Sequence, residues 1–124
     1  MSLKTLAYIF AGFFLAIGIL GFIPGVTEQG RLLGIFDVSP LHNVIHILSG
    51  LAALGLTMTM GDKGSKLYFQ VFGIVYGLVT VVGFIQGTTV LGLIGVNMAD
   101  NLLHLFITAV ALYAGFGMKP QQSM

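Results

Sequence analysis

Two asparagine–histidine pairs are the residues of this chain best suited to chemistry. Asn43 and His46 recur 58 positions later as Asn101 and His104. Residues three apart lie on one face of an α-helix, so each pair should present its amide and its imidazole together. Imidazole nitrogens bind metal ions and haem iron, and they exchange protons near neutral pH. The two pairs therefore predict a polar or ligand-binding site, with His46 and His104 facing inward at similar depth.

Three further residues are secondary candidates for this site: His42, Asp100 and Asp37. His42 precedes His46 by four residues, and Asp100 precedes His104 by the same spacing, so each shares a helix face with that histidine. The two asparagines are candidates for orienting the imidazoles from outside the ligand shell. If a metal is bound, we expect the two inward histidines to hold it.

The elements that position these residues are predicted to be membrane helices. Of the 124 residues, 56% are hydrophobic and 7% are charged, whereas soluble domains average about 25% charged residues. A helix needs roughly 20 apolar residues to cross the bilayer hydrocarbon. Four runs meet this condition, at residues 6–23, 40–60, 67–85 and 98–118. We expect a single all-α domain over residues 1–124, a four-helix transmembrane bundle.

The two halves are expected to be internal repeats. Leu33-Gly34 matches Leu91-Gly92 at the offset of 58 that relates the histidines. Repeat one covers about residues 5–60, and repeat two covers about residues 67–118. Each repeat is a helix, an apolar loop and a second helix, which returns the chain to its starting side. The two repeats should therefore have parallel orientations in the membrane.

The basic residues predict the topology. Four lysines lie at the termini and in the polar connection of residues 61–66: Lys4, Lys63, Lys66 and Lys119. These places share one side of a four-span chain, and Arg31 lies on the other side. Cytoplasmic segments are enriched in Lys and Arg, so both termini are expected in the cytoplasm. Tyr68, near one helix end, is expected to anchor at the membrane interface.

The composition argues against several classes of partner and of chemistry. The chain has no cysteine, which removes disulfides, thiolate nucleophiles and cysteine-ligated metal clusters. The net charge of +1 argues against a nucleic-acid partner. No nucleophile–base–acid set is visible, so no catalytic residue is predicted, and enzymatic activity is left open but not favoured. The expected partners are the lipid bilayer and, through the apolar helix faces, further copies of the chain or a larger membrane complex.

Three functions are compatible with these residues. The leading interpretation is a non-enzymatic integral membrane protein, a small structural or accessory component without a cofactor, whose Asn and His side chains link helices by hydrogen bonds. The first alternative is a haem- or metal-binding redox protein with His46 and His104 as ligands. The second alternative is proton or ion conduction through the Asn/His pairs, for which Thr57, Thr59 and Thr108 form a thin polar series.

The segment F-D-V-S-P-L-H-N-V-I-H at residues 36–46 resembles a pattern found in a family of small bacterial integral membrane proteins. The family pattern is F-D-V-x-P-x-H-N-x-x-H, followed in the second half by N-x-x-D-N-x-x-H. The second pattern is met by Asn97, Asp100, Asn101 and His104. The family is catalogued as a domain of unknown function. The resemblance implies a four-helix fold in a bacterial inner membrane and the importance of these positions, and it implies no reaction.

Overall fold

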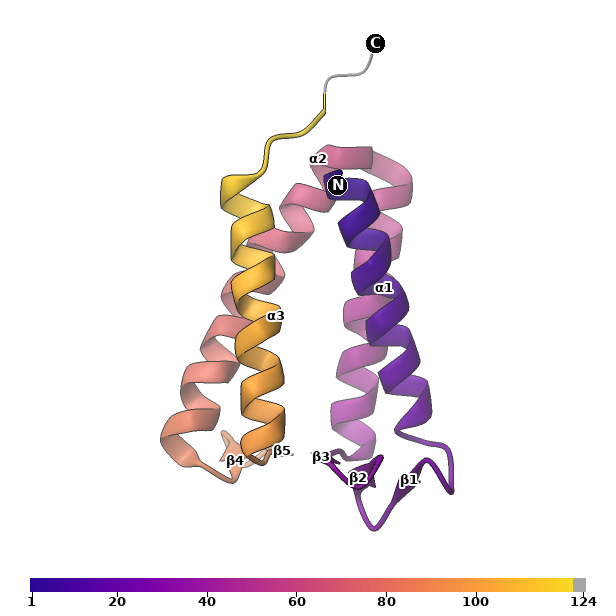
Figure 1. Ribbon diagram of the computed structural model, residues 1–124, viewed down its shortest axis with the longest axis vertical. Helices are drawn as coiled ribbons and strands as arrows, with labels where there is room; N and C mark the ends of the chain where they lie inside the picture. Colours follow the sequence, from indigo (N-terminus) through magenta and orange to yellow (C-terminus); the bar gives the residue numbers. More distant parts are fainter. Residues whose placement is uncertain (122–124) are drawn as a thin grey trace.

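The computed structural model describes residues 1–121, and most of them are helical. Its elements, in chain order, are α1 (Leu3–Leu20), β1 (Thr27–Glu28), β2 (Arg31–Leu32), β3 (Phe36–Asp37), α2 (Pro40–Gln86), β4 (Thr89–Val90), β5 (Ile94–Gly95) and α3 (Met98–Gly117). The helices run along the long axis of the molecule, with a bend in α2 at one end and all five strands at the other (Figure 1). We call these the bend end and the strand end.

The bend in α2 lies at Gly61, whose backbone leaves the helical region with φ 62° and ψ −141°. Glycine adopts a positive φ without the steric cost of a Cβ atom. The chain thereby forms two arms, residues 40–60 and 62–86, each of which extends between the bend and the strand end (Figure 1). The prediction of four separate helices is not confirmed. Residues 1–121 form three helices, because the polar connection of residues 61–66 is helical except at Gly61.

Small residues bring the helix backbones close together. A Cβ atom built on Gly50 would lie 2.8 Å from the Leu15 side chain, so α1 packs tightly against the first arm. A Cβ atom on Gly115 would lie 2.7 Å from the backbone nitrogen of Gln70, so α3 packs equally tightly against the second arm. Close backbone contact through small residues is typical of helix association in lipid. The core that joins these helices includes Ala7, Ala11, Ala53, Phe69 and Ala111.

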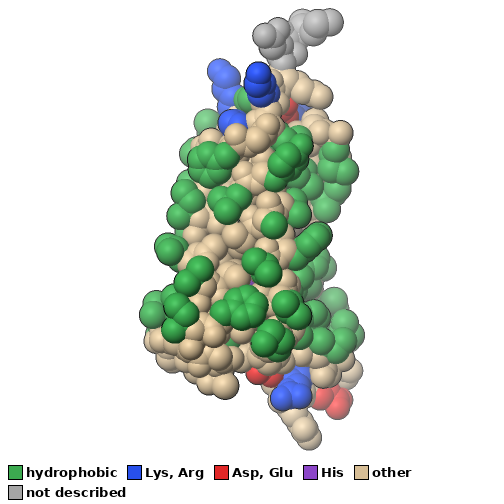
Figure 2. Space-filling model, turned by 60° about the vertical axis from the view of Figure 1, so that its left-hand side comes forward, with side chains coloured by type: hydrophobic (Ala, Val, Ile, Leu, Met, Phe, Trp, Pro, Cys, Tyr) green, Lys and Arg blue, Asp and Glu red, His purple; other side chains and the backbone are tan. Residues whose placement is uncertain are grey.

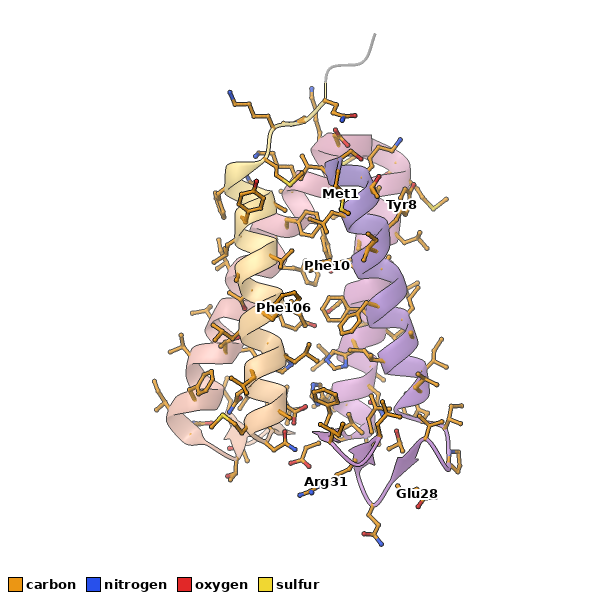
Figure 3. The ribbon with its side chains drawn as sticks, viewed as in Figure 1. Met1, Tyr8, Phe10, Glu28, Arg31 and Phe106 are labelled. Carbon is orange, nitrogen blue, oxygen red and sulfur yellow. The ribbon has the colours of Figure 1, made fainter. Side chains whose placement is uncertain are left out.

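The surface along the helices is apolar, and charged side chains gather at the two ends (Figure 2). Large exposed side chains along the helices include Ile19, Leu48, Leu78 and Phe106. At the strand end, Arg31 and Glu28 project from the first connection (Figure 3). All three helices are long and apolar enough to cross a membrane. This distribution is that of a membrane protein, since a soluble domain would leave far less apolar surface in one continuous band.

The two connections at the strand end contain matching tight turns that the sequence analysis did not predict. Leu33 and Gly34 have φ values of 55° and 70°, and Leu91 and Gly92 have φ values of 55° and 69°. Two consecutive positive φ angles define the tight turn that joins antiparallel strands with the correct twist. In the first connection this turn joins β2 to β3 in the three-stranded sheet β1-β2-β3, and in the second it joins β4 to β5.

Both connections fold back onto the helices. Leu32 and Val90, the residues just before the two turns, are buried, as are Ile94 and Val96. Some apolar residues of these loops therefore pack against the rest of the protein, and others are exposed on its surface. The connections cover the strand end of the helices, where Leu32 and Ile94 border cavities that His46 and His104 also line.

Candidate functional site

The helix starts fix the depth of the histidines. Ser39 caps α2, its Oγ accepting a hydrogen bond from the backbone N–H of His42 at 3.2 Å, and Pro40 follows at the first helical position. His42 thus lies in the first turn of α2, and His46 lies one turn further along the same face. α3 begins with a reciprocal cap between Asn97 and Asp100, and His104 follows one turn after Asp100.

The three imidazoles meet inside the protein. His42, His46 and His104 expose only 2%, 5% and 2% of their surface. Ring centroids are 4.3 Å apart for His42 and His46, 5.8 Å for His42 and His104, and 6.3 Å for His46 and His104. One nitrogen from each ring lies within 4.8 Å of the corresponding nitrogens of the other two. We call these three residues the histidine cluster. Sequence reasoning gave His42 a secondary place, whereas the geometry makes it an equal member.

Most of the ring nitrogens in the histidine cluster lack a hydrogen-bond partner. Among residues 1–121, no partner is found for His42 Nδ1 and Nε2, His46 Nδ1 or His104 Nδ1, all of which are buried. A buried polar atom without a partner costs roughly 1–3 kcal/mol. Such groups need an explanation, which at a functional site is often a bound ligand or ion. Three converging imidazoles with free nitrogens have the donor atoms that a transition-metal ion requires.

The two asparagines serve the helix contacts, not the imidazoles. Asn101 Nδ2 donates to the carbonyl oxygen of Gly83 at 3.2 Å. The Asn101 amide lies so close to Gly83 that a Cβ atom there would overlap it, and the Asn43 amide lies against Gly21 in the same way. Within the described part of the chain, neither amide is hydrogen-bonded to a histidine ring. The structure therefore does not show the contacts by which they would orient the imidazoles.

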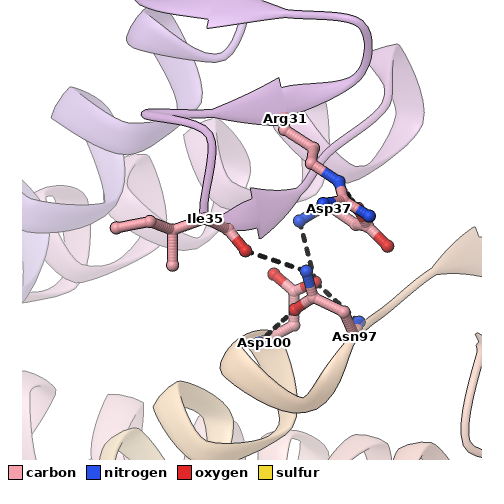
Figure 4. Close-up of polar contacts among 5 residues, drawn as sticks. All are labelled: Arg31, Ile35, Asp37, Asn97 and Asp100. Atoms are coloured by element: carbon pink, nitrogen blue, oxygen red, sulfur yellow. Dashed lines mark hydrogen bonds and ion pairs between the residues drawn. The ribbon is translucent and has the colours of Figure 1, made fainter.

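The acidic candidates link the first sheet to α3 (Figure 4). Asp100 Oδ2 accepts hydrogen bonds from the backbone N–H groups of Asp37 at 3.0 Å and Asn97 at 2.9 Å. Asn97 Nδ2 donates to the carbonyl oxygen of Ile35 at 2.8 Å. The Asp37 carboxylate pairs with Arg31 at 3.2 Å and is partly exposed. Asp37 and Asp100 thus hold the cover over the histidine cluster and are not part of it.

Three residues that sequence reasoning did not place in the site surround the cluster. The Phe14 ring lies 5.7 Å from the His46 ring, and the Tyr76 ring lies 5.7 Å from the His104 ring. Ser49 Oγ is 2.9 Å from the Tyr76 hydroxyl. Ser49 could have been found, because it follows His46 by three residues on the same helix face. Phe14 and Tyr76 belong to other segments, and no sequence signal connected them to the cluster.

Two cavities flank the histidine cluster. One, of about 190 Å³, lies between the two arms of α2 and is lined by all three histidines. The other, of about 210 Å³, lies between α1, the first connection and α3 and is lined by His46, His104 and Asp100. We call them the arm cavity and the sheet cavity. Apart from the histidines and a few polar groups, both have apolar walls.

The chain matches the model of a known protein family. The model of a family described as a domain of unknown function (DUF4383) matches residues 4–117. This chain belongs to that family. No curated protein and no solved structure matches it. The match agrees with the resemblance noted in the sequence. Membership in DUF4383 by itself indicates no activity.

Proposed function

We propose that this DUF4383 protein crosses the membrane four times and binds one transition-metal ion through His42, His46 and His104. The length of α2 supports the four crossings. Its 47 residues would span about 70 Å as one straight helix, more than twice the roughly 30 Å of bilayer hydrocarbon. The bend at Gly61, beside Asp62 and Lys63, divides α2 into two arms of membrane-spanning length.

The proposed orientation places both termini and the bend in the cytoplasm of a bacterial cell, with the strand end outside the inner membrane. The lysines support it, because Lys4, Lys63, Lys66 and Lys119 belong to the termini and the bend, and cytoplasmic segments are enriched in such residues. The matching turns and the matching Asn43–Gly21 and Asn101–Gly83 contacts support a duplicated helical hairpin as the plan of the fold.

The convergence of three buried nitrogens is the observation that favours metal binding over a purely structural role. The structural interpretation requires the histidines to link helices by hydrogen bonds. Within the described residues, four of their six ring nitrogens are buried without a partner at hydrogen-bond geometry, and the Asp37 backbone is the group that approaches the His42 ring. Nitrogens bound to a tetrahedral zinc ion at 2.0–2.1 Å lie roughly 3.3 Å apart. Binding would therefore draw the three rings slightly together from their present separations of up to 4.8 Å.

The same geometry favours a metal ion over haem. A haem iron takes two axial ligands on opposite faces of a wide, flat ring. With His46 and His104 as the axial ligands, a haem would need the space beside the line that joins them. The His42 ring, whose centroid is 4.3 Å from that of His46 and 5.8 Å from that of His104, occupies this space. Three imidazoles around one ion, with a coordination position left open, are the ligand set of catalytic zinc sites.

Conduction is disfavoured by the core between the cluster and the bend. Phe10 lies between α1 and α3 at mid-height (Figure 3), and its ring packs 5.0 Å from the ring of Phe69. Ala53 and Ala111 are buried in the same core. Within the described residues, these apolar side chains separate the histidine cluster from Thr57, so the polar series does not continue toward the cytoplasm.

The test is metal binding by the full-length protein, purified in detergent with an affinity tag that contains no histidine. The protein should bind Co²⁺ or Zn²⁺ with one ion per chain, and His42→Gln, His46→Gln and His104→Gln should each weaken binding at least tenfold. The matched control is Thr57→Val, a buried polar position on the same arm. Binding that is unchanged in the triple histidine variant would contradict the proposal.

A further inference from the structure

The arm cavity offers a second ligand direct access to the proposed metal. It is lined by all three members of the histidine cluster, whereas the sheet cavity is lined by His46 and His104 but not His42. An ion held by three imidazoles keeps an open coordination position. Because all three ligands border the arm cavity, this position faces it.

We propose that the arm cavity binds a neutral, lipid-soluble molecule about one aromatic ring in size, which offers a lone pair to the metal. This inference rests on the proposed metal site and names the class of its ligand. Size supports it, because the cavity of about 190 Å³ exceeds the roughly 150 Å³ of an apolar cavity that binds benzene.

The walls of the arm cavity select against charge. Apart from the histidine cluster, they consist of apolar side chains and two hydroxyl groups, with no Lys, Arg, Asp or Glu. The hydroxyls are already engaged: Ser49 Oγ donates to the carbonyl oxygen of Ile45 at 2.8 Å, so the Tyr76 hydroxyl donates to Ser49. A charged ligand would lose its hydration without gaining a counter-charge from these walls. A neutral ligand avoids this cost of desolvating a charge.

The ligand would arrive from the bilayer. Val75, on the second arm, lines the cavity and is also 46% exposed on the apolar outer surface. Val79, one turn further along the same arm, also lines the cavity and is only partly buried. The cavity therefore reaches the surface that would face lipid acyl chains. A molecule that partitions into the membrane meets this opening directly, whereas a polar solute does not.

The experiment uses Co²⁺-loaded full-length protein, because the visible bands of bound cobalt report on its ligands. Titration with 4-methylpyridine, the neutral probe, should change the bands in a saturable way, and azide, the charged probe, should bind at least tenfold more weakly. Val79→Phe should weaken 4-methylpyridine binding at least tenfold. Val75→Phe, at an exposed position, serves as a second blocking variant should the first fold poorly. Ile17 lines the sheet cavity and not the arm cavity, so the Ile17→Phe variant should bind 4-methylpyridine like the wild type.

The outcomes separate the two proposals. One Co²⁺ per chain with no response to 4-methylpyridine would overturn the ligand inference and leave the metal site standing. The ligand inference would also be overturned, with the metal site left standing, by either of two results. One is that azide binds as tightly as 4-methylpyridine; the other is that both valine variants retain cobalt and bind 4-methylpyridine like the wild type. Absence of cobalt binding would overturn both.

Discussion

The His42 and His46 rings lie 4.3 Å apart, one turn apart on the first arm of α2. His104, from α3, approaches from a helix that packs mainly on the other arm, and its ring lies 5.8 Å from that of His42. A contact of this kind ties the two halves of the molecule together at the strand end. A metal ion bound there would strengthen that connection.

Metal binding should therefore stabilise the folded protein. An ion present at about 100 times its Kd adds about 2.7 kcal/mol to the free energy of unfolding, by mass action alone. We expect Zn²⁺ to raise the Tm of the detergent-solubilised protein, and a chelator to reverse the rise. The triple variant of His42, His46 and His104 to Gln should show no zinc-dependent rise. An equal rise in that variant would place the bound metal elsewhere.

Gly83 and Gly21 should tolerate no added methyl group, because Gly83 lies against the Asn101 amide and Gly21 lies against the Asn43 amide. We expect Gly83→Ala and Gly21→Ala each to lower the free energy of unfolding by about 1–3 kcal/mol, because the new Cβ atom would overlap an asparagine amide. Reversible unfolding in mixed micelles gives the measurement.

Gly12 and Gly55 provide the matched controls for these variants. A Cβ atom at either position has no neighbour within 4 Å. Alanine there should be neutral or should stabilise by up to about 1 kcal/mol, since alanine is the better helix former. Equal effects at all four glycines would show that the asparagine contacts do not restrict these positions.

The carboxylate of Asp100 should hold the first connection in place over the histidine cluster. Asp100→Ala leaves the backbone N–H groups of Asp37 and Asn97 without their acceptor, which should cost about 1–3 kcal/mol. Hydrogen exchange at these two amides should accelerate. Asp62 also accepts two backbone hydrogen bonds, but in an exposed setting. Asp62→Ala should therefore have a smaller effect and leave exchange at the strand end unchanged.

The position of these acidic groups shows what the sequence could predict. Asn97 and Asp100, three residues apart, match a helix-capping pattern, and the structure forms that cap. Local spacing fixes such a cap. The contact of Asp100 with Asp37 joins residues 63 positions apart, and no local rule reveals it. The strands were missed for the same reason, because each has only two residues and depends on a turn and on burial against the helices.

Two expectations that were based on side-chain polarity are wrong. The polar stretch of residues 61–66 was expected to be a loop, yet it stays helical except at Gly61. Tyr68 was expected at the membrane interface, yet it is fully buried and stacks on Phe72 with ring centroids 4.5 Å apart. Helix spacing correctly placed His42 and His46 on one face. Whether His104 turns toward both depends on the rotation of α3, which the sequence alone does not determine.

The absence of native cysteine allows a direct test of the orientation. We expect Glu28→Cys to react with a membrane-impermeant maleimide in cells whose inner membrane is intact, because Glu28 projects at the strand end (Figure 3). Lys63→Cys, beside the bend, should react only after the membrane is broken. The reverse pattern would invert the orientation, and labelling of both positions in intact cells would contradict the membrane topology.

X-ray absorption at the zinc edge tests the central claim most directly. The zinc-loaded wild-type protein should show one ion per chain with three imidazole nitrogens at about 2.0–2.1 Å, and the three single histidine-to-glutamine variants should each lose one imidazole or the ion itself. A zinc content far below one per chain, or a spectrum unchanged in all three variants, would contradict the assignment of the histidine cluster as a metal site.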